Sequence, residues 1–285
     1  MTACSLHGPR SDHSKVDSAR LLLLTIGFCF LPALAIAADQ DAGALSWLNE
    51  PIDSTRPHDI DAATSWHGRL MVLAWAFLFP VGILAARFFK VMPGQNWPHV
   101  LDNKRWWHTH LFSQYSGGIL VVIALGLGLY ATSTGENDAI DLHHILGWIV
   151  IVFAAFQFLG GWLRGTKGGP TDPGPDGALH GDHYDMTRRR RLFEYAHKSG
   201  GYIALFTACA AVLTGLYAAN APRWMWLGLA GWWCLLISLA TWLQANGFAR
   251  DTYEAIWGPD KSHPGNHMRP IGIGVTRRRT PNRPD

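Results

Sequence analysis

Five long apolar runs dominate the chain, and they cover residues 67–89, 107–131, 143–163, 197–218 and 224–246. Apart from Arg69, their Asp, Glu, Lys and Arg residues fall only at the edges. Each run is long enough to cross a hydrocarbon core of about 30 Å, because a helix rises about 1.5 Å per residue. The pattern predicts an all-α fold, namely a transmembrane helix bundle.

A sixth and shorter apolar run lies near the N-terminus, at residues 21–36, after a positively charged start. It ends in small residues, Ala35 and Ala37. This layout is typical of a secretory signal peptide, which we expect at residues 1–37. The alternative is an uncleaved anchor helix, for which the run is slightly short.

The polar regions define the remaining boundaries. Residues 38–66 are too few to build a core of their own, so we expect a short exported polar segment there. Residues 67–247 form the expected transmembrane domain. Residues 248–285 are rich in Pro, Arg and Asn, and we expect a cytoplasmic tail that is partly disordered.

Charge placement predicts the orientation of the helices. Only 16% of the residues are charged, and the net charge of +3 is small. The basic residues gather after the first and third runs, whereas residues 133–142 contain none. By the positive-inside rule, the mature N-terminus is exported and the C-terminus is cytoplasmic, in the cell (inner) membrane. Nucleic acid is not an expected partner, because the basic segments are not interleaved with stacking aromatic residues.

The cysteines exclude several kinds of site. Cys4, Cys29, Cys209 and Cys234 show no CxxC spacing, and none is followed by a correctly placed histidine. A disulfide scaffold, a zinc ribbon and a covalently attached haem are therefore not expected.

Histidines stand at the start of four of the five runs. They are His67, then His108 and His110, then His143 and His144, then His197. Adjacent helices run antiparallel, so histidines of the first and third runs meet at one membrane face, and those of the second and fourth meet at the other. Facing imidazoles at two depths suit two haems, each with two axial ligands, whereas zinc prefers about four protein ligands in one place.

Several motifs resemble the cytochrome b561 domain of eukaryotic DOMON-linked proteins, over roughly residues 66 to 265. The residues that carry the resemblance are His67-Gly68-Arg69-Leu70-Met71, Trp75, Pro80, Trp106, His110, Gln114, His143, Gly147, Gln157, His197 and Gly201-Tyr202. The resemblance implies that the first four helices bind two haem b groups and that a fifth helix follows. It also implies the axial pairs His67 with His143 and His110 with His197, in place of His108 and His144.

The resemblance implies a di-haem b-type cytochrome. It would carry single electrons from an unknown cytoplasmic donor to an unknown exported acceptor, as a ferric or other reductase. Arg69 and His144 beside one haem, and Lys104 and Arg105 beside the other, are candidate partners for haem propionates or for an anionic donor. An ordinary basic belt at the membrane interface is the alternative for these residues. Membrane lipid is an expected partner, and a homodimer is one candidate assembly.

Two other functions stay open at this point. One is a haem-bearing anchor subunit of a partner enzyme, and the other is a non-redox membrane protein whose histidines bind metal ions or relay protons. The insert 172–185 offers His180, Asp182 and His183 as candidates for a separate metal site. A flexible, solvated loop is the preferred interpretation of that insert.

Overall fold

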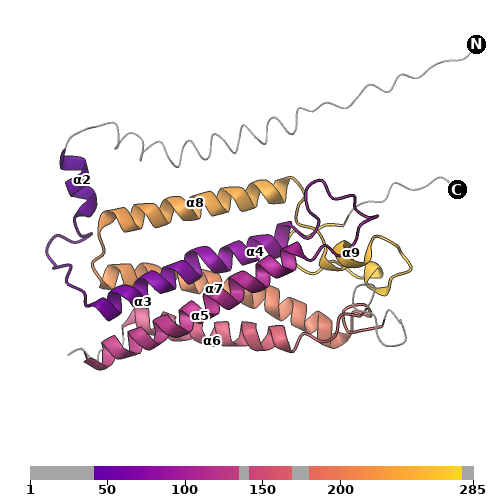
Figure 1. Cartoon of the computed structure of the whole chain (residues 1–285), viewed down its shortest axis with the longest axis horizontal. Coiled ribbons are helices and arrows are strands. Elements are labelled where there is room, and N and C mark those ends of the chain that lie inside the picture. The colour runs from indigo at the N-terminus through magenta and orange to yellow at the C-terminus, as the bar shows by residue number, and fades with distance from the viewer. Residues whose placement is uncertain (1–41, 135–140, 169–179, 278–285) are drawn as a thin grey trace, which may run out of the picture.

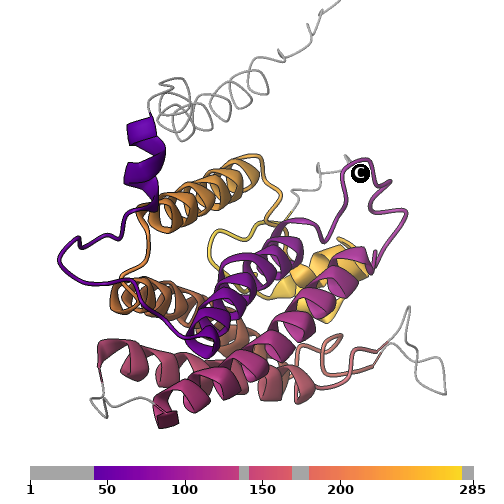
Figure 2. The same ribbon diagram turned by 60° about the vertical axis from the view of Figure 1, so that its left-hand side comes forward.

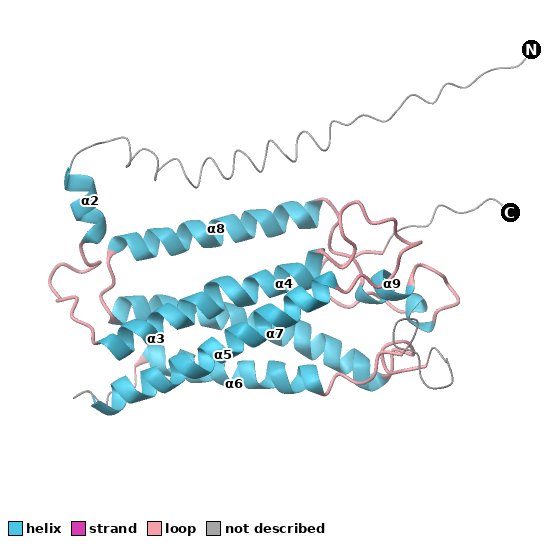
Figure 3. Cartoon of the chain, viewed as in Figure 1, coloured by secondary structure: helices cyan, strands magenta, loops and turns pink. Residues whose placement is uncertain are grey.

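The computed structural model describes residues 42–134, 141–168 and 180–277 (Figure 1). The signal peptide expected at residues 1–37 lies outside these residues, as do Cys4 and Cys29. The described parts are helical and contain no strand, only two isolated bridges (Figure 3). The helices are α2 (Ala42–Asn49), α3 (Ala62–Val72), the π-helix η1 (Leu73–Leu78), α4 (Phe79–Phe88), α5 (Arg105–Thr134), α6 (Leu142–Trp162), α7 (Arg188–Ala218), α8 (Arg223–Ala245), α9 (Thr252–Trp257) and the 3-10 helix η2 (Pro264–His267).

Five helical segments are long and apolar enough to cross a membrane. The first is the continuous run of α3, η1 and α4, called α3–α4 below, and the others are α5, α6, α7 and α8. They coincide with the five apolar runs, so the predicted all-α transmembrane bundle is confirmed.

Helix α7 begins earlier than its apolar run indicates. It starts at Arg188, where the side chain of Thr187 caps it by accepting a hydrogen bond from the Arg190 N–H. Its 31 residues span about 46 Å, which exceeds a hydrocarbon core of about 30 Å. The charged first turns therefore have room to lie beyond the lipid, which is why hydropathy alone places the start too late.

The bundle consists of two antiparallel hairpins. Helix α5 packs along α3–α4, and α7 packs along α6 (Figures 1 and 2). Between the hairpins lies a cluster of buried apolar side chains. Its buried members are Ala74, Trp75, Phe79, Val121, Val150, Ala204, Ala208 and Ala211. The small residues allow the backbones to approach closely, as is usual between membrane helices.

Helix α8 stands at the edge of this bundle (Figure 2). Two side-chain hydrogen bonds attach it to α3–α4, one from Arg87 to Gln244 at 2.8 Å and one from Trp232. Pro80 lacks an N–H, so the Ala76 carbonyl one turn earlier loses its usual helical donor. The Trp232 indole Nε1 of α8 donates to that carbonyl at 2.7 Å, and its ring stacks on Phe77. A hydrogen bond between membrane helices contributes about 0.6 kcal/mol on average. A backbone group freed by proline thus becomes one attachment point of α8.

The chain after α8 folds back over one end of the bundle. The Tyr253 hydroxyl donates to the Tyr184 carbonyl at 2.7 Å, and Arg277 forms an ion pair with Asp251. All six residues of α9 are buried. We call the end covered by this segment the α9 end of the bundle, and the opposite end the α3 end (Figure 1). Residues 278–285 of the expected tail lie outside the described residues.

One expectation for the insert 172–185 is wrong in its described part. His183 is 1% exposed, whereas the sequence favours a solvated loop. The rings of Tyr253 and Trp257 enclose it, with centroids 5.6 and 6.1 Å from its own. These aromatic residues follow two helices later in the chain, so the local sequence of the loop gives no signal of this packing.

Candidate functional site: two facing pairs of histidines

Four histidines meet in two pairs, one near each end of the bundle. His67 of α3 faces His143 of α6, with ring centroids 6.0 Å apart and ring planes 86° apart. His110 of α5 faces His197 of α7, with centroids 6.3 Å apart and planes 81° apart. Each pair takes one member from each hairpin, so both sites lie between the two hairpins. The other members of the histidine couplets, His108 and His144, are in neither pair.

The spacing within each pair matches a shared metal ion. Imidazole nitrogens bind such an ion at about 2 Å, and each ring centre lies about 1.1 Å further out, so two opposed rings have centroids about 6 Å apart. A direct hydrogen bond between the rings would require a closer approach, and none links either pair among the described side chains. Each pair can therefore hold one metal centre between its rings.

Backbone carbonyls fix the tautomer of three of these histidines. The Nδ1 of His67 donates to the Ala124 carbonyl at 2.8 Å, that of His110 to Gly82 at 3.0 Å, and that of His143 to Ala211 at 2.9 Å. A carbonyl can only accept, so Nδ1 carries the proton and Nε2 keeps its lone pair. This is the usual arrangement of a metal-binding histidine.

The second helix of each hairpin contains a histidine, an alanine and a glycine at the same spacing. In α5 these are His110, Ala124 and Gly128, and in α7 they are His197, Ala211 and Gly215, with identical intervals between them. The interval from histidine to glycine is about five turns of helix, or about 27 Å, so the glycine lies on the same face as the histidine. Each of these helices thus carries one histidine and also receives the histidine of its neighbour.

The two glycines provide the space for those neighbouring rings. A Cβ at Gly128 would lie 2.7 Å from the His67 Nδ1, and one at Gly215 would lie 2.8 Å from the His143 Cε1. Real Cβ atoms do not come that close to a ring. Glycine at these two positions therefore lets each imidazole rest directly on the backbone of the next helix.

The expected flanking residues lie outside the two pairs. Arg69 is exposed, with its guanidinium 5.3 Å from the Trp66 ring centre. Lys104 and Arg105 are exposed at the start of α5. His144 bonds through Nδ1 to Asp141 at 2.9 Å, although its ring centre is 6.0 Å from that of His143. Their places at the two ends fit either the cofactor-pairing or the interfacial interpretation.

A buried ionic cluster near the His110–His197 pair is not foreseen by the sequence patterns. Glu194, one turn before His197, is 4% exposed and pairs with Arg190 at 3.1 Å and with Lys198 at 2.7 Å. The His183 Nε2 lies 3.7 Å from the same carboxylate. Burial lowers the pKa of His183 to about 3, so that ring is neutral at physiological pH. In the sequence, this cluster is visible only as the acid Glu194 with one basic residue a helical turn before it and another a turn after it.

Lys90, just beyond α4, is a second unexpected buried charge. Its ammonium donates to the carbonyls of Arg87 and Arg250 at 3.4 and 3.2 Å. Burial, with the nearby positive charge of Lys198, lowers the pKa of Lys90 to about 7. Its charge therefore changes close to neutral pH.

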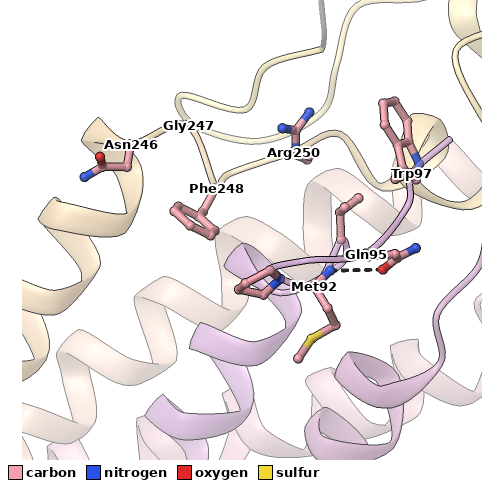
Figure 4. Close-up of a pocket in the computed structure, with 9 residues that line it drawn as sticks. Met92, Gln95, Trp97, Asn246, Gly247, Phe248 and Arg250 are labelled. Atoms are coloured by element: carbon pink, nitrogen blue, oxygen red, sulfur yellow. Dashed lines mark hydrogen bonds between the residues drawn. The ribbon is translucent and has the colours of Figure 1, made fainter. Parts of the chain in front are cut away.

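A surface pocket of 240 Å³ lies apart from the histidine pairs, between the loop after α4 and the segment after α8 (Figure 4). The Met92 N–H donates to the Gln95 side chain at 3.0 Å, and Arg250 lies 5.6 Å from the Trp97 ring centre. None of the four paired histidines lines this pocket. It is not part of the candidate site.

The described residues contain no group of three or more His, Cys, Asp or Glu side chains placed to hold a metal ion. His180, a candidate metal ligand with Asp182 and His183, has a side chain that is 81% exposed, whereas that of His183 is 2% exposed. Asp182 instead accepts from the Thr187 hydroxyl at 2.9 Å. Fold and site together define a transmembrane helix bundle that presents two facing histidine pairs.

Comparison with known proteins finds relatives of one kind. Over 159 residues, 55% of this chain, it is 31% identical to a cytochrome b561, DM13 and DOMON domain-containing protein of Arabidopsis thaliana. Over 151 residues, 53% of the chain, it is 31% identical to ferric-chelate reductase 1 of Bos taurus, and the human protein of that name is 28% identical over 150 residues. These relatives support the resemblance to the cytochrome b561 domain that the sequence motifs indicate.

The chain spans only a small part of these relatives. The match covers 15% of the Arabidopsis protein and 22% of each ferric-chelate reductase. No protein-family model matches the chain, and no solved structure matches it significantly.

Proposed function

We propose that this protein is a di-haem b-type cytochrome that carries single electrons across a membrane. The proposal rests on the two facing histidine pairs at opposite ends of one bundle. The ring centroids within the two pairs are 6.0 and 6.3 Å apart. His67 with His143 would hold one haem, and His110 with His197 the other. When bound, haem supplies a one-electron change between ferric and ferrous iron.

The residues present fit this group. Three of the four imidazoles keep an Nε2 lone pair for iron, because their Nδ1 donates to a carbonyl. Two histidines at each site would occupy the iron positions that oxygen needs, which favours electron transfer over oxygen activation. A non-redox metal site is a poorer fit, since each end offers two imidazoles and no third ligand among the described residues.

The chain's own residues would position the groups and exclude water. The carbonyls of Ala124, Gly82 and Ala211 hold three rings in a fixed orientation. The buried side chains of the core between the two ends are apolar, which disfavours the passage of ions. The bundle would therefore let electrons pass without opening a conducting pore.

We propose that electrons move from a cytoplasmic donor at the α9 end to an exported acceptor at the α3 end. The basic residues at the α9 end support this direction. Relatives named ferric-chelate reductases suggest a ferric chelate as the acceptor to test first.

The first expected measurement is haem content: acid acetone should extract about two b-type haems per fully loaded chain. A fully loaded preparation that contains one haem or none would refute the two-site proposal.

The orientation has its own expected result. A reporter fused after Asn220 should be exported, and one fused after Lys261 should be cytoplasmic, because Lys and Arg concentrate at the α9 end. Alkaline phosphatase and green fluorescent protein fusions at both positions measure this directly. The reverse readout would invert the direction of electron flow, while the two-haem proposal would still stand.

A further inference from the structure

His197 is held differently from the other three histidines, and we infer that Gln157 of α6 is the residue that fixes its tautomer and thereby sets the potential of the haem at the α9 end. This inference rests on the proposed two-haem function. The Nδ1 atoms of His67, His110 and His143 all face backbone carbonyls. The Nδ1 of His197 faces the side-chain amide of Gln157, at 2.9 Å.

A side-chain amide can present either of two groups to a ring. With its nitrogen toward His197, Gln157 donates to Nδ1 and to the His197 carbonyl at 3.0 Å, and its oxygen accepts from the Gly201 N–H at 3.1 Å. This orientation leaves the proton of the neutral ring on Nε2, where it would block iron. Turned over, the amide presents its oxygen, which accepts from Nδ1–H and frees the Nε2 lone pair. This orientation gives up the other two bonds, because the oxygen then faces the His197 carbonyl and the nitrogen faces the Gly201 N–H. Binding of iron by His197 therefore requires the second orientation.

The internal repeat explains why this position is special. The carbonyl of Gly82 accepts the hydrogen bond from His110. Gly82 and Gln157 have nearly equivalent places in the two hairpins, because the interval from His67 to Gly82 is one residue longer than the interval from His143 to Gln157. At the His110–His197 pair, the first hairpin thus offers a backbone carbonyl to its histidine, and the second hairpin offers an amide side chain. The two hairpins differ at the group that controls ligand basicity.

Gly200 of α7 makes room for the amide. A Cβ there would lie 2.6 Å from the Gln157 amide group. Helix α7 therefore has a gap that Gln157 occupies in order to reach His197. This gap allows the amide to be displaced without altering Gln157 itself.

The expected direction follows from ligand basicity. An acceptor at Nδ1–H makes an imidazole a stronger donor to iron and favours the ferric state. Q157L removes the acceptor, so the potential of one haem should rise, and Q157E offers a stronger acceptor, so it should fall. A tenfold change in the preference for ferric over ferrous iron corresponds to about 59 mV for one electron.

The test is a spectroelectrochemical titration of the purified, haem-loaded protein, with EPR spectra of its ferric forms. Q157L should raise one of the two potentials by about 59 mV, Q157E should lower the same one, and the EPR signal of the same centre should shift. G200A should raise that potential as Q157L does, without any change of charge. Gln114 is the matched control, because its amide donates to the Phe79 carbonyl at 3.4 Å and forms no hydrogen bond to a histidine of the described parts of the chain. Q114L should leave both potentials in place.

The outcomes separate this inference from the proposed function. If the wild-type protein holds two haems and neither Q157L nor Q157E nor G200A moves a potential, the role of Gln157 is refuted and the two-haem proposal stands. If Q157L does not fold, Q157E and G200A decide the question. A shift of both haems by equal amounts would also overturn the inference, because Gln157 contacts one pair only. Absence of haem from the wild type would refute the proposed function instead.

Discussion

His110→Ala and His143→Ala should each remove one haem and leave the other. Each substitution takes one imidazole from a facing pair and leaves its partner alone at the site, so the haem content should fall from about two per chain to about one. The two losses should affect different spectral components, because His110 and His143 belong to opposite ends of the bundle. Reduced-minus-oxidised spectra and pyridine haemochrome assays measure both quantities.

The neighbouring histidines are the matched controls. His108 is exposed, and His144 bonds to Asp141. His108→Ala and His144→Ala should therefore retain both haems, with at most a small shift in potential. Loss of haem from these variants, with retention in His110→Ala and His143→Ala, would show that the proposed ligands of the two helices are wrong.

Gly128→Val and Gly215→Val should each weaken haem binding at the α3 end. A Cβ at either position already lies within 3 Å of an imidazole, and valine adds two more carbons. Because each ring rests on backbone, it can only move away, which turns its Nε2 out of line. Displacing a ligand in this way should weaken haem binding about 10- to 100-fold, while the other site keeps its haem.

Gly126→Val supplies the control for the glycine variants. It lies in α5, close before Gly128, and a Cβ there would meet nothing within 4 Å. It should therefore bind two haems and elute as the wild type does in size-exclusion chromatography. If Gly126→Val loses haem as fully as Gly128→Val, the effect comes from valine in the helix and the proposed role of Gly128 is wrong.

The sequence is sufficient to predict the helices and the histidine couplets, because both are local patterns. A run of apolar residues without charges predicts a membrane helix wherever it occurs. The antiparallel order of successive helices then brings His67 to the same end as His143, and His110 to the same end as His197. The glycines that seat the rings, Gly128 and Gly215, lie at the far ends of their helices, where nothing in the local sequence distinguishes them from other glycines.

Other features depend on contacts between distant segments and could not be predicted. His183 is buried by Tyr253 and Trp257, which follow two helices later. Glu194 is part of a basic stretch that predicts only topology, and its burial depends on how the chain after α8 folds back. The role proposed for Gln157 requires knowing which atom faces His197, since the spacing of the two residues in sequence says nothing about it.

The repeated hairpin has a consequence for the ancestry of the fold. One hairpin supplies one histidine to each pair and completes neither. Two identical hairpins related by a twofold axis would complete both sites at once, with the same spacing of histidine, alanine and glycine in each copy. Duplication and fusion of a gene for such a hairpin would give the present four-helix core in one step. On this account, Gln157 would mark a place where the copies diverged, because it faces His197 where the first hairpin presents the Gly82 carbonyl to His110. Divergence there would let one duplicated site acquire a potential different from its twin.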